Sequence, residues 1–186
     1  MKIIVAITGA SGGLYARLCL EQLLAAHEVE QIALIISDTA AKVLAHEGIT
    51  LPQSEKIVQH PNDDMFSAVA SGSAGYDAMI IVPASMGSVG RIAAGVSLSL
   101  IERAADVMLK ERRRLIIVPR ETPYSLIHLR NMTTLTEAGA IVLPASPSFY
   151  SHPKTISQAI DTVVERIIAH AGIDSAHYEF SGHEGK

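Results

Sequence analysis

The feature that most constrains the fold is an apolar segment that ends in a glycine-rich turn near the start of the sequence. Residues 3–7 read IIVAI and residues 8–13 read TGASGG. An aliphatic run without polar alternation is typical of a strand buried on both faces of a sheet. The small residues that follow lead into a helical pattern, where backbone N–H groups at a helix start can receive an anion. The pattern predicts a phosphate-bearing ligand at this turn, and the alternative is a tight turn formed for packing alone.

The composition indicates a single domain with much apolar surface to bury. The 186 residues are 48% hydrophobic but 4% aromatic, with a net charge of −4 and one Cys. A sheet covered on both faces, or contacts between subunits, would bury the aliphatic excess. The negative charge argues against nucleic acid as the main partner. No Cys/His cluster has metal spacing, one Cys forms no internal disulfide, and no uncharged apolar run spans a membrane. We therefore expect a cytoplasmic, metal-free protein with one domain over 1–170 and a flexible tail over 171–186.

Apolar strand-like runs alternate with helical patterns along most of the chain. Strands are predicted at 3–7, 32–36, 78–82, 115–118 and 140–143, with an edge strand at 56–59. Helices are predicted at 14–26, 39–46, 63–70, 89–94, 97–111, 125–138 and 155–170. This alternation is typical of an α/β fold in which crossover connections join parallel strands. The sequence predicts a Rossmann-like or flavodoxin-like three-layer sandwich around a mainly parallel sheet.

Polar residues follow the ends of the predicted strands. They are Ser11, Ser37, Ser85, Arg120 and the turn at 149–150. Parallel strands share one carboxyl edge, and open α/β sheets bind ligands there. The turn at 85–88, which reads SMGS, is rich in hydrogen-bond donors and suits a phosphate or the polar edge of a flavin. The sequence contains neither a G-x-G-x-x-G motif nor a P-loop, which argues against a nicotinamide enzyme and a nucleoside triphosphatase.

Basic residues suited to phosphate are spread over three predicted elements. Arg103 and Lys110 lie two helical turns apart, so they project from one helix face about 10 Å apart. Arg120 follows a strand, and Arg166 lies on the last helix. Together these side chains could form a cationic pocket, because guanidinium groups bind phosphate bidentately and Lys supplies a point charge. A solvated helix face explains Arg103 and Lys110 equally well.

Two more side chains at the predicted ligand edge have suitable chemistry. Glu121 follows Arg120 directly and lies between Pro119 and Pro123. A carboxylate at such an edge can transfer protons, and the alternative is a surface ion pair with Arg120. The hydroxyl of Tyr150 can reach a phosphate, and the alternative is an amphipathic residue that packs a turn.

Several segments together resemble the UbiX-type flavin prenyltransferases. They are TGASG at 8–12, ASGS at 70–73, PASMG at 83–87, LIERAADV at 100–107, LKERR at 109–113, VPRETP at 118–123, HLRNM at 128–132, GA at 139–140 and FYSHP at 149–153. The resemblance covers about residues 1–170, which is nearly the whole chain.

The resemblance implies a metal-independent enzyme that joins the dimethylallyl group of dimethylallyl monophosphate to N5 and C6 of reduced FMN. Its product, prenylated FMN, serves UbiD-type decarboxylases, and the enzyme is expected to be a homododecamer. By position, the FMN-binding residues are Gly9, Ala10, Ser11, Ser37, Ser85, Met86, Gly87, Ser88 and Arg120. The residues implied to bind the prenyl phosphate are Arg103, Lys110, Tyr150 and Arg166, and the implied catalytic residues are Glu121, Ser11 and Lys110.

Two other functions remain open at this stage. An FMN-dependent cysteine decarboxylase of the related homo-oligomeric flavoprotein group would share the fold and the cofactor. That group typically has PASANT where this chain has PASMGS at 83–88. A non-catalytic flavin-binding protein would keep the glycine and serine turns but would need neither Glu121 nor the basic residues.

Overall fold

The computed structural model describes residues 1–174, in which six parallel strands form one sheet with the order β3-β2-β1-β4-β5-β6. The strands are β1 (Lys2–Ile7), β2 (Gln31–Ile36), β3 (Ile57–His60), β4 (Ala78–Ala84), β5 (Arg114–Pro119) and β6 (Ile141–Val142). The strand order reverses between β1 and β4, as in dinucleotide-binding folds, where ligands bind in the crevice at this switch point. The predicted α/β sandwich is confirmed.

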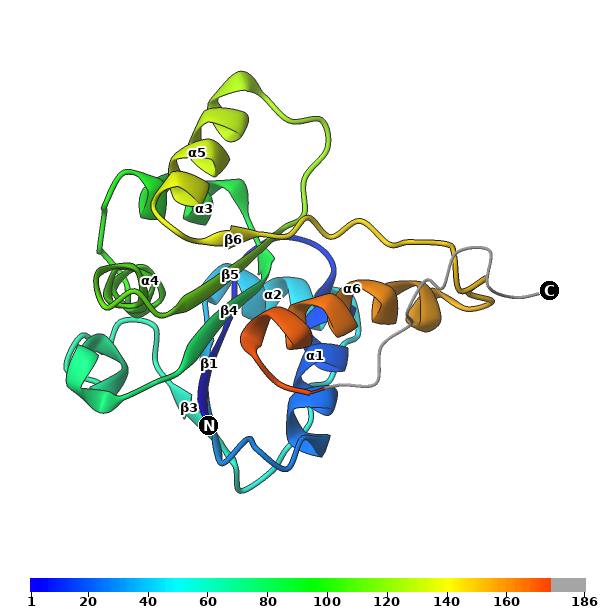
Figure 1. The fold of residues 1–186 in the computed structure, drawn as a ribbon, viewed down its shortest axis with the longest axis horizontal. Helices are drawn as coiled ribbons and strands as arrows, with labels where there is room; N and C mark the ends of the chain where they lie inside the picture. Colours follow the sequence, from blue (N-terminus) through cyan, green and yellow to red (C-terminus); the bar gives the residue numbers. More distant parts are fainter. Residues whose placement is uncertain (175–186) are drawn as a thin grey trace.

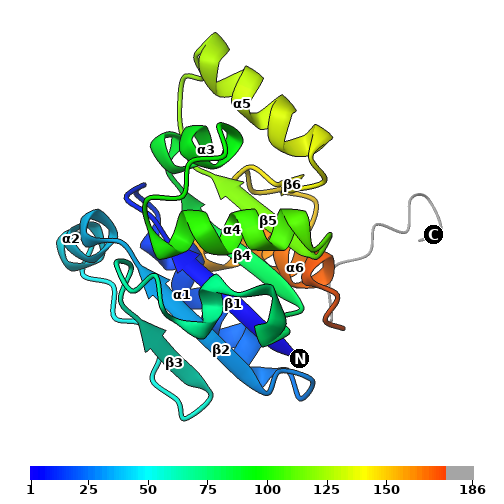
Figure 2. The same cartoon turned by 90° about the vertical axis from the view of Figure 1, so that its left-hand side faces the viewer.

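The helices cover the sheet on both faces, which gives three layers (Figure 1). They are α1 (Gly13–Ala25), α2 (Asp38–His46), α3 (Met86–Ala93), α4 (Leu100–Lys110), α5 (Leu126–Glu137) and α6 (Ile156–Ala171), with short 3-10 turns η1 (Ala68–Ala70) and η2 (Gly72–Ala74). The helices α1 and α6 pack on one face, whereas α3, α4 and η1 pack on the other, which faces the viewer in Figure 2.

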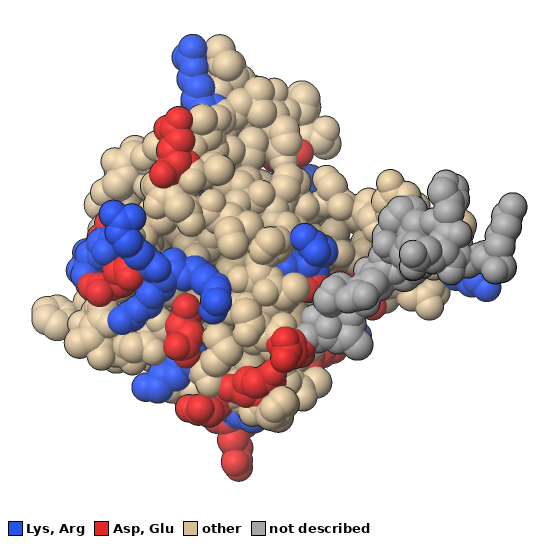
Figure 3. Space-filling view, viewed as in Figure 1, with Lys and Arg blue, Asp and Glu red and all other residues tan. Residues whose placement is uncertain are grey.

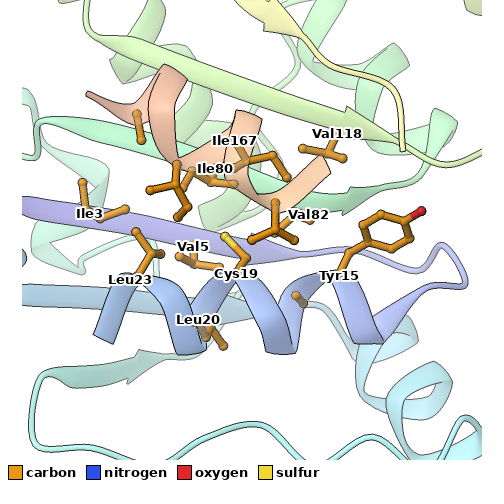
Figure 4. Close-up of a cluster of buried hydrophobic side chains, with 14 of the residues drawn as sticks. Ile3, Val5, Tyr15, Cys19, Leu20, Leu23, Ile80, Val82, Val118 and Ile167 are labelled. Atoms are coloured by element: carbon orange, nitrogen blue, oxygen red, sulfur yellow. The ribbon is translucent and has the colours of Figure 1, made fainter. Parts of the chain in front are cut away.

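The sheet has a hydrophobic core on each face, and alternate residues of the central strands point into one core or the other. Ile3 and Val5 of β1 point toward α1 and α6, while Ile4 and Ala6 point toward α3 and α4. Figure 4 shows the first of these cores, where Cys19 of α1 lies among the strand side chains. Cys19 is fully buried, and burial raises the pKa of its thiol to about 12, so this residue packs the core as an inert thiol.

The predicted helix at 63–70 is wrong, because the segment forms turns that end in η1. The carboxylate of Asp64 accepts the N–H of Phe66, and the hydroxyl of Ser67 accepts that of Val69. Such local bonds compete with a helix. Asn62 also holds the segment against the start of α4, because its backbone and side-chain oxygens accept the N–H groups of Leu100 and Ile101.

The starts of two predicted segments differ from the structure. The helix predicted at 97–111 begins at Leu100, because Ser99 and Glu102 form a capping box. The tail predicted at 171–186 starts within the packed chain, since Ala171 and Ile173 are buried. Residues 175–186 of that predicted tail lie outside the described residues.

Candidate active site

The turns after β1 and β4 are joined at the switch point by Thr8, a residue that no local sequence pattern distinguishes. Thr8 is 2% exposed, and its hydroxyl donates to the carbonyl of Pro83 at 3.0 Å. The same hydroxyl accepts the backbone N–H of Ser85 at 2.7 Å. A buried hydroxyl with both roles satisfied fixes the two turns relative to each other. The predicted ligand turns at 8–13 and 85–88 therefore lie side by side.

Ser37 and Ser85 lie at the starts of α2 and α3, where each caps its helix. The hydroxyl of Ser37 accepts the N–H of Ala40 at 3.2 Å, and that of Ser85 accepts the N–H of Ser88 at 3.4 Å. An N-cap hydroxyl uses its oxygen as the acceptor and keeps its proton as a donor. Both serines therefore have the chemistry to donate to a ligand at the carboxyl edge.

Close packing requires glycine at position 9. A Cβ at Gly9 would lie 2.5 Å from Cγ2 of Thr39, so the first turn can approach α2 only without a side chain. The neighbouring Ala10 is buried, and its N–H donates to the carbonyl of Thr8 at 2.8 Å. Gly12 has a φ of 113°, which favours glycine. The packing alternative therefore explains part of the glycine pattern.

Glu47, which follows α2, occupies the anion-binding position at the start of α1. Its two carboxylate oxygens accept the N–H groups of Gly12 at 2.8 Å and Gly13 at 2.7 Å. These N–H groups were predicted to face a ligand anion, and the structure corrects that prediction, because the chain supplies the anion itself. The only sequence signal for Glu47 is an acidic residue that follows a predicted helix, and nothing local connects it to a turn 34 residues away.

The surroundings of Glu47 keep it ionised. Partial burial acts to raise the pKa of the carboxyl, but the Ser11 side chain, the N–H groups of Gly12 and Gly13, and the charge of Arg120 outweigh it and lower the pKa. A carboxylate with a lowered pKa stabilises the folded state above its unfolded value of 4.5, and that stabilisation is lost as the pH falls through the folded value.

Replacing Glu47 with Gln is expected to destabilise the protein at neutral pH and to weaken the loss of stability in acid. Gln cannot carry the charge that Arg120 and the two N–H groups stabilise. Urea unfolding midpoints at about pH 7 and about pH 3.5 measure both effects. Glu55→Gln is the matched control, because Glu55 is exposed on a loop. The same pH dependence in the Glu47 variant and the wild type would contradict this assignment.

Arg120 crosses the switch point from the end of β5. Its backbone N–H donates to the carbonyl of Ala84 at 3.2 Å, and its Nε donates to the carbonyl of Ser11 at 3.0 Å. The guanidinium thus lies over the first turn and close enough to Glu47 to lower its pKa. The structure therefore brings Arg120 together with Ser11, as the strand-end pattern predicts.

The remaining predicted residues of this edge lie in three environments. Met86 and Ser88 are buried, whereas Gly87 is exposed. Glu121 is half-buried after Arg120, and its Oε1 accepts the N–H of Thr122 at 2.9 Å.

Arg103 and Lys110 do not share a pocket with Arg166 within one chain. Helix α4 carries the first two residues on one face of the sheet, and α6 carries Arg166 on the other. The prediction that one chain gathers these residues in a single cationic pocket is therefore wrong. Helical periodicity shows which residues share a helix face, but it does not show which face of the sheet the helix covers.

Arg103 and Lys110 have acidic neighbours. Nη1 of Arg103 pairs with Asp106 at 2.7 Å, and its Nε donates to the carbonyl of Ala70 at 3.2 Å. Nζ of Lys110 pairs with Glu111. Figure 3 shows Lys and Arg side chains over α4 with acidic side chains between them. Lys110 also ends α4 just before β5 begins, so it lies near the amino edge, about 20 Å from the carboxyl edge.

Arg166 lines a pocket on the far side of the sheet. The pocket has a volume of about 440 Å³ and lies between α6 and the segment after β6. Leu143, Ser146, Ser148, Ser151 and His170 share its lining. Tyr150 precedes Ser151 and is exposed. The pocket combines hydroxyl groups with the guanidinium of Arg166, which can bind a small anion, and with the carboxylate of Glu165.

Within residues 1–174, no group of three His, Cys, Asp or Glu side chains is arranged to hold a metal ion. In the same part of the chain, none of the helices has the length and apolar character needed to cross a bilayer.

Residues 1–172 match the family model described as Flavoprotein. The chain is 47% identical over 182 residues to the flavin prenyltransferase UbiX of Methanocaldococcus jannaschii, covering 96% of this chain and 97% of that protein. It is also 47% identical over 176 residues to the enzyme of the same name from Thermoplasma acidophilum, with coverages of 93% and 96%.

Solved structures show the same fold. AnUbiX (PadA1), solved in complex with FMN and dimethylallyl pyrophosphate, superposes with a TM-score of 0.91 at 39% identity over 98% of each chain. A dodecameric FMN-dependent UbiX-like decarboxylase from Escherichia coli has a TM-score of 0.90 at 35% identity, covering 98% of this chain and all of that one. A PPC decarboxylase, at 14% identity and a TM-score of 0.63, shares the fold alone. The chain belongs to the flavoprotein family and, within it, to the UbiX-type flavin prenyltransferases.

Proposed function

We propose that this protein transfers the dimethylallyl group of dimethylallyl monophosphate to N5 and C6 of reduced FMN. The observation that carries the proposal is the cluster at the switch point, where Arg120 lies over the first turn beside Glu47 and Thr8 ties that turn to Ser85. A chain 39% identical to this one has been solved with FMN and a dimethylallyl phosphate ester. FMN carries a phosphate and a polar ring edge, and the cluster offers a guanidinium and several hydroxyl donors for them.

The flavin site is assigned to the carboxyl edge of β1, β2, β4 and β5. Its residues are Gly9, Ala10, Ser11, Ser37, Ser85, Met86, Gly87, Ser88 and Arg120. Ser37 and Ser85 keep hydroxyl protons for the ligand, while Glu47 orders the turn that presents Ser11. When bound, the reduced flavin supplies the nucleophilic nitrogen. Glu121 is assigned to hold or move a proton near that nitrogen, assisted by Ser11.

The donor phosphate is assigned to Arg103, Lys110, Tyr150 and Arg166, brought together from different copies of the chain. One copy holds these residues on opposite faces of its sheet, so a shared site needs a neighbour. Apolar side chains are exposed on the same elements, including Leu98 before α4, Phe149 next to Tyr150 and Ile156 at the start of α6. The E. coli relative is described as dodecameric, and we propose a homododecamer here. Converging cations stabilise a leaving phosphate without a metal, and Lys110 is assigned to that step.

Two further assignments follow from the proposed chemistry. The product, prenylated FMN, would pass to a UbiD-type decarboxylase, because a modified flavin is useful only to an enzyme that binds it. A reducing cytoplasm suits an enzyme that takes reduced FMN as a substrate. The cysteine decarboxylase and the non-catalytic flavin carrier are the weaker alternatives, because the relatives at 47% identity are named flavin prenyltransferases.

The product formed from reduced FMN tests the proposed function. The protein is incubated without oxygen with reduced FMN and either dimethylallyl monophosphate or dimethylallyl pyrophosphate. We expect the flavin to gain the mass of one prenyl group, with release of the phosphate from the monophosphate. Unmodified flavin with both donors intact would contradict the proposal. Two solved relatives are named decarboxylases, so release of CO2 from phenylacrylic acid or a cysteine peptide is measured in parallel, and CO2 without prenylation would favour that activity instead.

A further inference from the structure

An ion pair between a buried carboxylate and a partly exposed guanidinium lies next to the turn at 85–88. The carboxylate of Glu102, in the first turn of α4, is 3% exposed. It accepts the N–H of Leu98 at 2.8 Å and that of Ser99 at 3.1 Å, and it pairs with Nε of Arg91. A buried carboxylate with three donors is satisfied and is costly to disturb. Glu102 therefore fixes the guanidinium of Arg91 at the end of α3.

Arg91 reaches from Glu102 to the flavin turn. Its side chain is 47% exposed, yet its Nη2 lies 3.4 Å from Oγ of Ser88. A guanidinium has only donors, so the oxygen of Ser88 must act as the acceptor in this contact. The rigid fork of Arg, held at Nε by Glu102, sets the direction from which Ser88 receives this bond.

This contact biases the direction in which the two serine hydroxyls point. Oγ of Ser88 lies 3.1 Å from Oγ of Ser85, where either hydroxyl could donate if the pair stood alone. The oxygen of Ser88 has a second lone pair, but the positive charge of Arg91 beside it favours the orientation in which the Ser88 proton points away from the guanidinium and toward Ser85. Ser85 already accepts the N–H of Ser88 at 3.4 Å, so its oxygen is the acceptor of both bonds. The proton of Ser85 is then left for a ligand at the carboxyl edge.

We propose that Arg91 and Glu102 are positioning residues that orient the Ser88–Ser85 pair so that Ser85 presents a hydrogen-bond donor to the bound flavin. The inference rests on the proposed function only in placing FMN at this turn. The successive contacts are an ion pair from Glu102 to Arg91, a hydrogen bond from Arg91 to Ser88 and a hydrogen bond from Ser88 to Ser85. Neither Arg91 nor Glu102 touches the flavin in this arrangement.

A double-mutant cycle on FMN affinity tests the inference. Arg91→Gln in the wild-type background is expected to weaken FMN binding about fivefold, the effect of losing one oriented hydrogen bond. In a Ser85→Ala background the same substitution is expected to change FMN binding little, because the donor that Arg91 orients is already absent. Arg91→Lys is expected to restore part of the affinity, since Lys can still donate to Ser88. Binding is measured by flavin fluorescence, and thermal unfolding confirms that each variant folds.

Equal losses from Arg91→Gln in the two backgrounds would overturn the inference, because Arg91 would then act independently of Ser85. A purely structural role for Arg91 predicts the same result. The outcome is separate from that of the prenylation assay, which uses a second substrate. If wild-type protein binds FMN but forms no prenylated product, the proposed function fails while the cycle still reports on Arg91.

Discussion

Replacement of Glu121 by Gln is expected to leave FMN bound with nearly unchanged affinity and to slow prenyl transfer about 100-fold or more, the usual contribution of a general acid or base. Gln has nearly the same shape and can still accept the N–H of Thr122, so the turn after β5 should keep its conformation. Gln cannot take up or release a proton at neutral pH. Single-turnover formation of prenylated flavin measures the rate, and flavin fluorescence measures the affinity.

Glu137→Gln is the matched control for this substitution, because Glu137 is an exposed residue at the end of α5. The control should prenylate FMN at the wild-type rate. Unchanged turnover in the Glu121 variant would remove this carboxylate from the mechanism. A parallel loss of FMN affinity and rate would instead make Glu121 a binding residue.

Replacement of Arg166 by Ala is expected to weaken binding of the dimethylallyl donor by about 10- to 100-fold, the effect of losing hydrogen bonds to a charged group. FMN affinity should change little, because Arg166 lies in the α6 pocket and not at the switch point. The measured quantities are the KM for dimethylallyl monophosphate and the Kd for FMN.

Arg17→Ala provides the comparison, since Arg17 is a surface residue that pairs with Glu21 one turn along α1. It should alter neither constant. If Arg166→Ala weakened FMN and donor binding equally, the assignment of Arg166 to the donor phosphate would be wrong.

The sheet and the flavin edge were predictable because both depend on local patterns. Short, unbroken aliphatic runs such as 32–36 and 78–82 are typical of buried strands, and all six predicted strands are present. Strand ends fall at one edge of a parallel sheet, so Ser85 and Arg120 could be placed near the first turn without coordinates. This placement needs only the order of strands and helices along the chain, because that order makes the strands parallel.

The parts that failed depend on contacts that no local pattern encodes. The carboxylate of Glu47 takes the helix-start N–H groups of Gly12 and Gly13, which lie 35 and 34 residues away. Helical spacing correctly placed Arg103 and Lys110 on one helix, but it could not show that α6 lies on the opposite face of the sheet. Thr8 was overlooked because a threonine in a turn becomes informative only when its partners, Pro83 and Ser85, are known.

The measurement that tests the shared donor site most directly combines two defective variants in one oligomer. Lys110→Ala and Arg166→Ala chains, each nearly inactive alone, are co-expressed with different tags, and mixed assemblies are isolated. If Lys110 and Arg166 of different copies complete each site, random assembly should restore about one quarter of the wild-type prenylation rate, because that share of sites receives both intact residues. Activity no greater than that of the separate variants would contradict the account, since it would show that one chain supplies both residues to the same site.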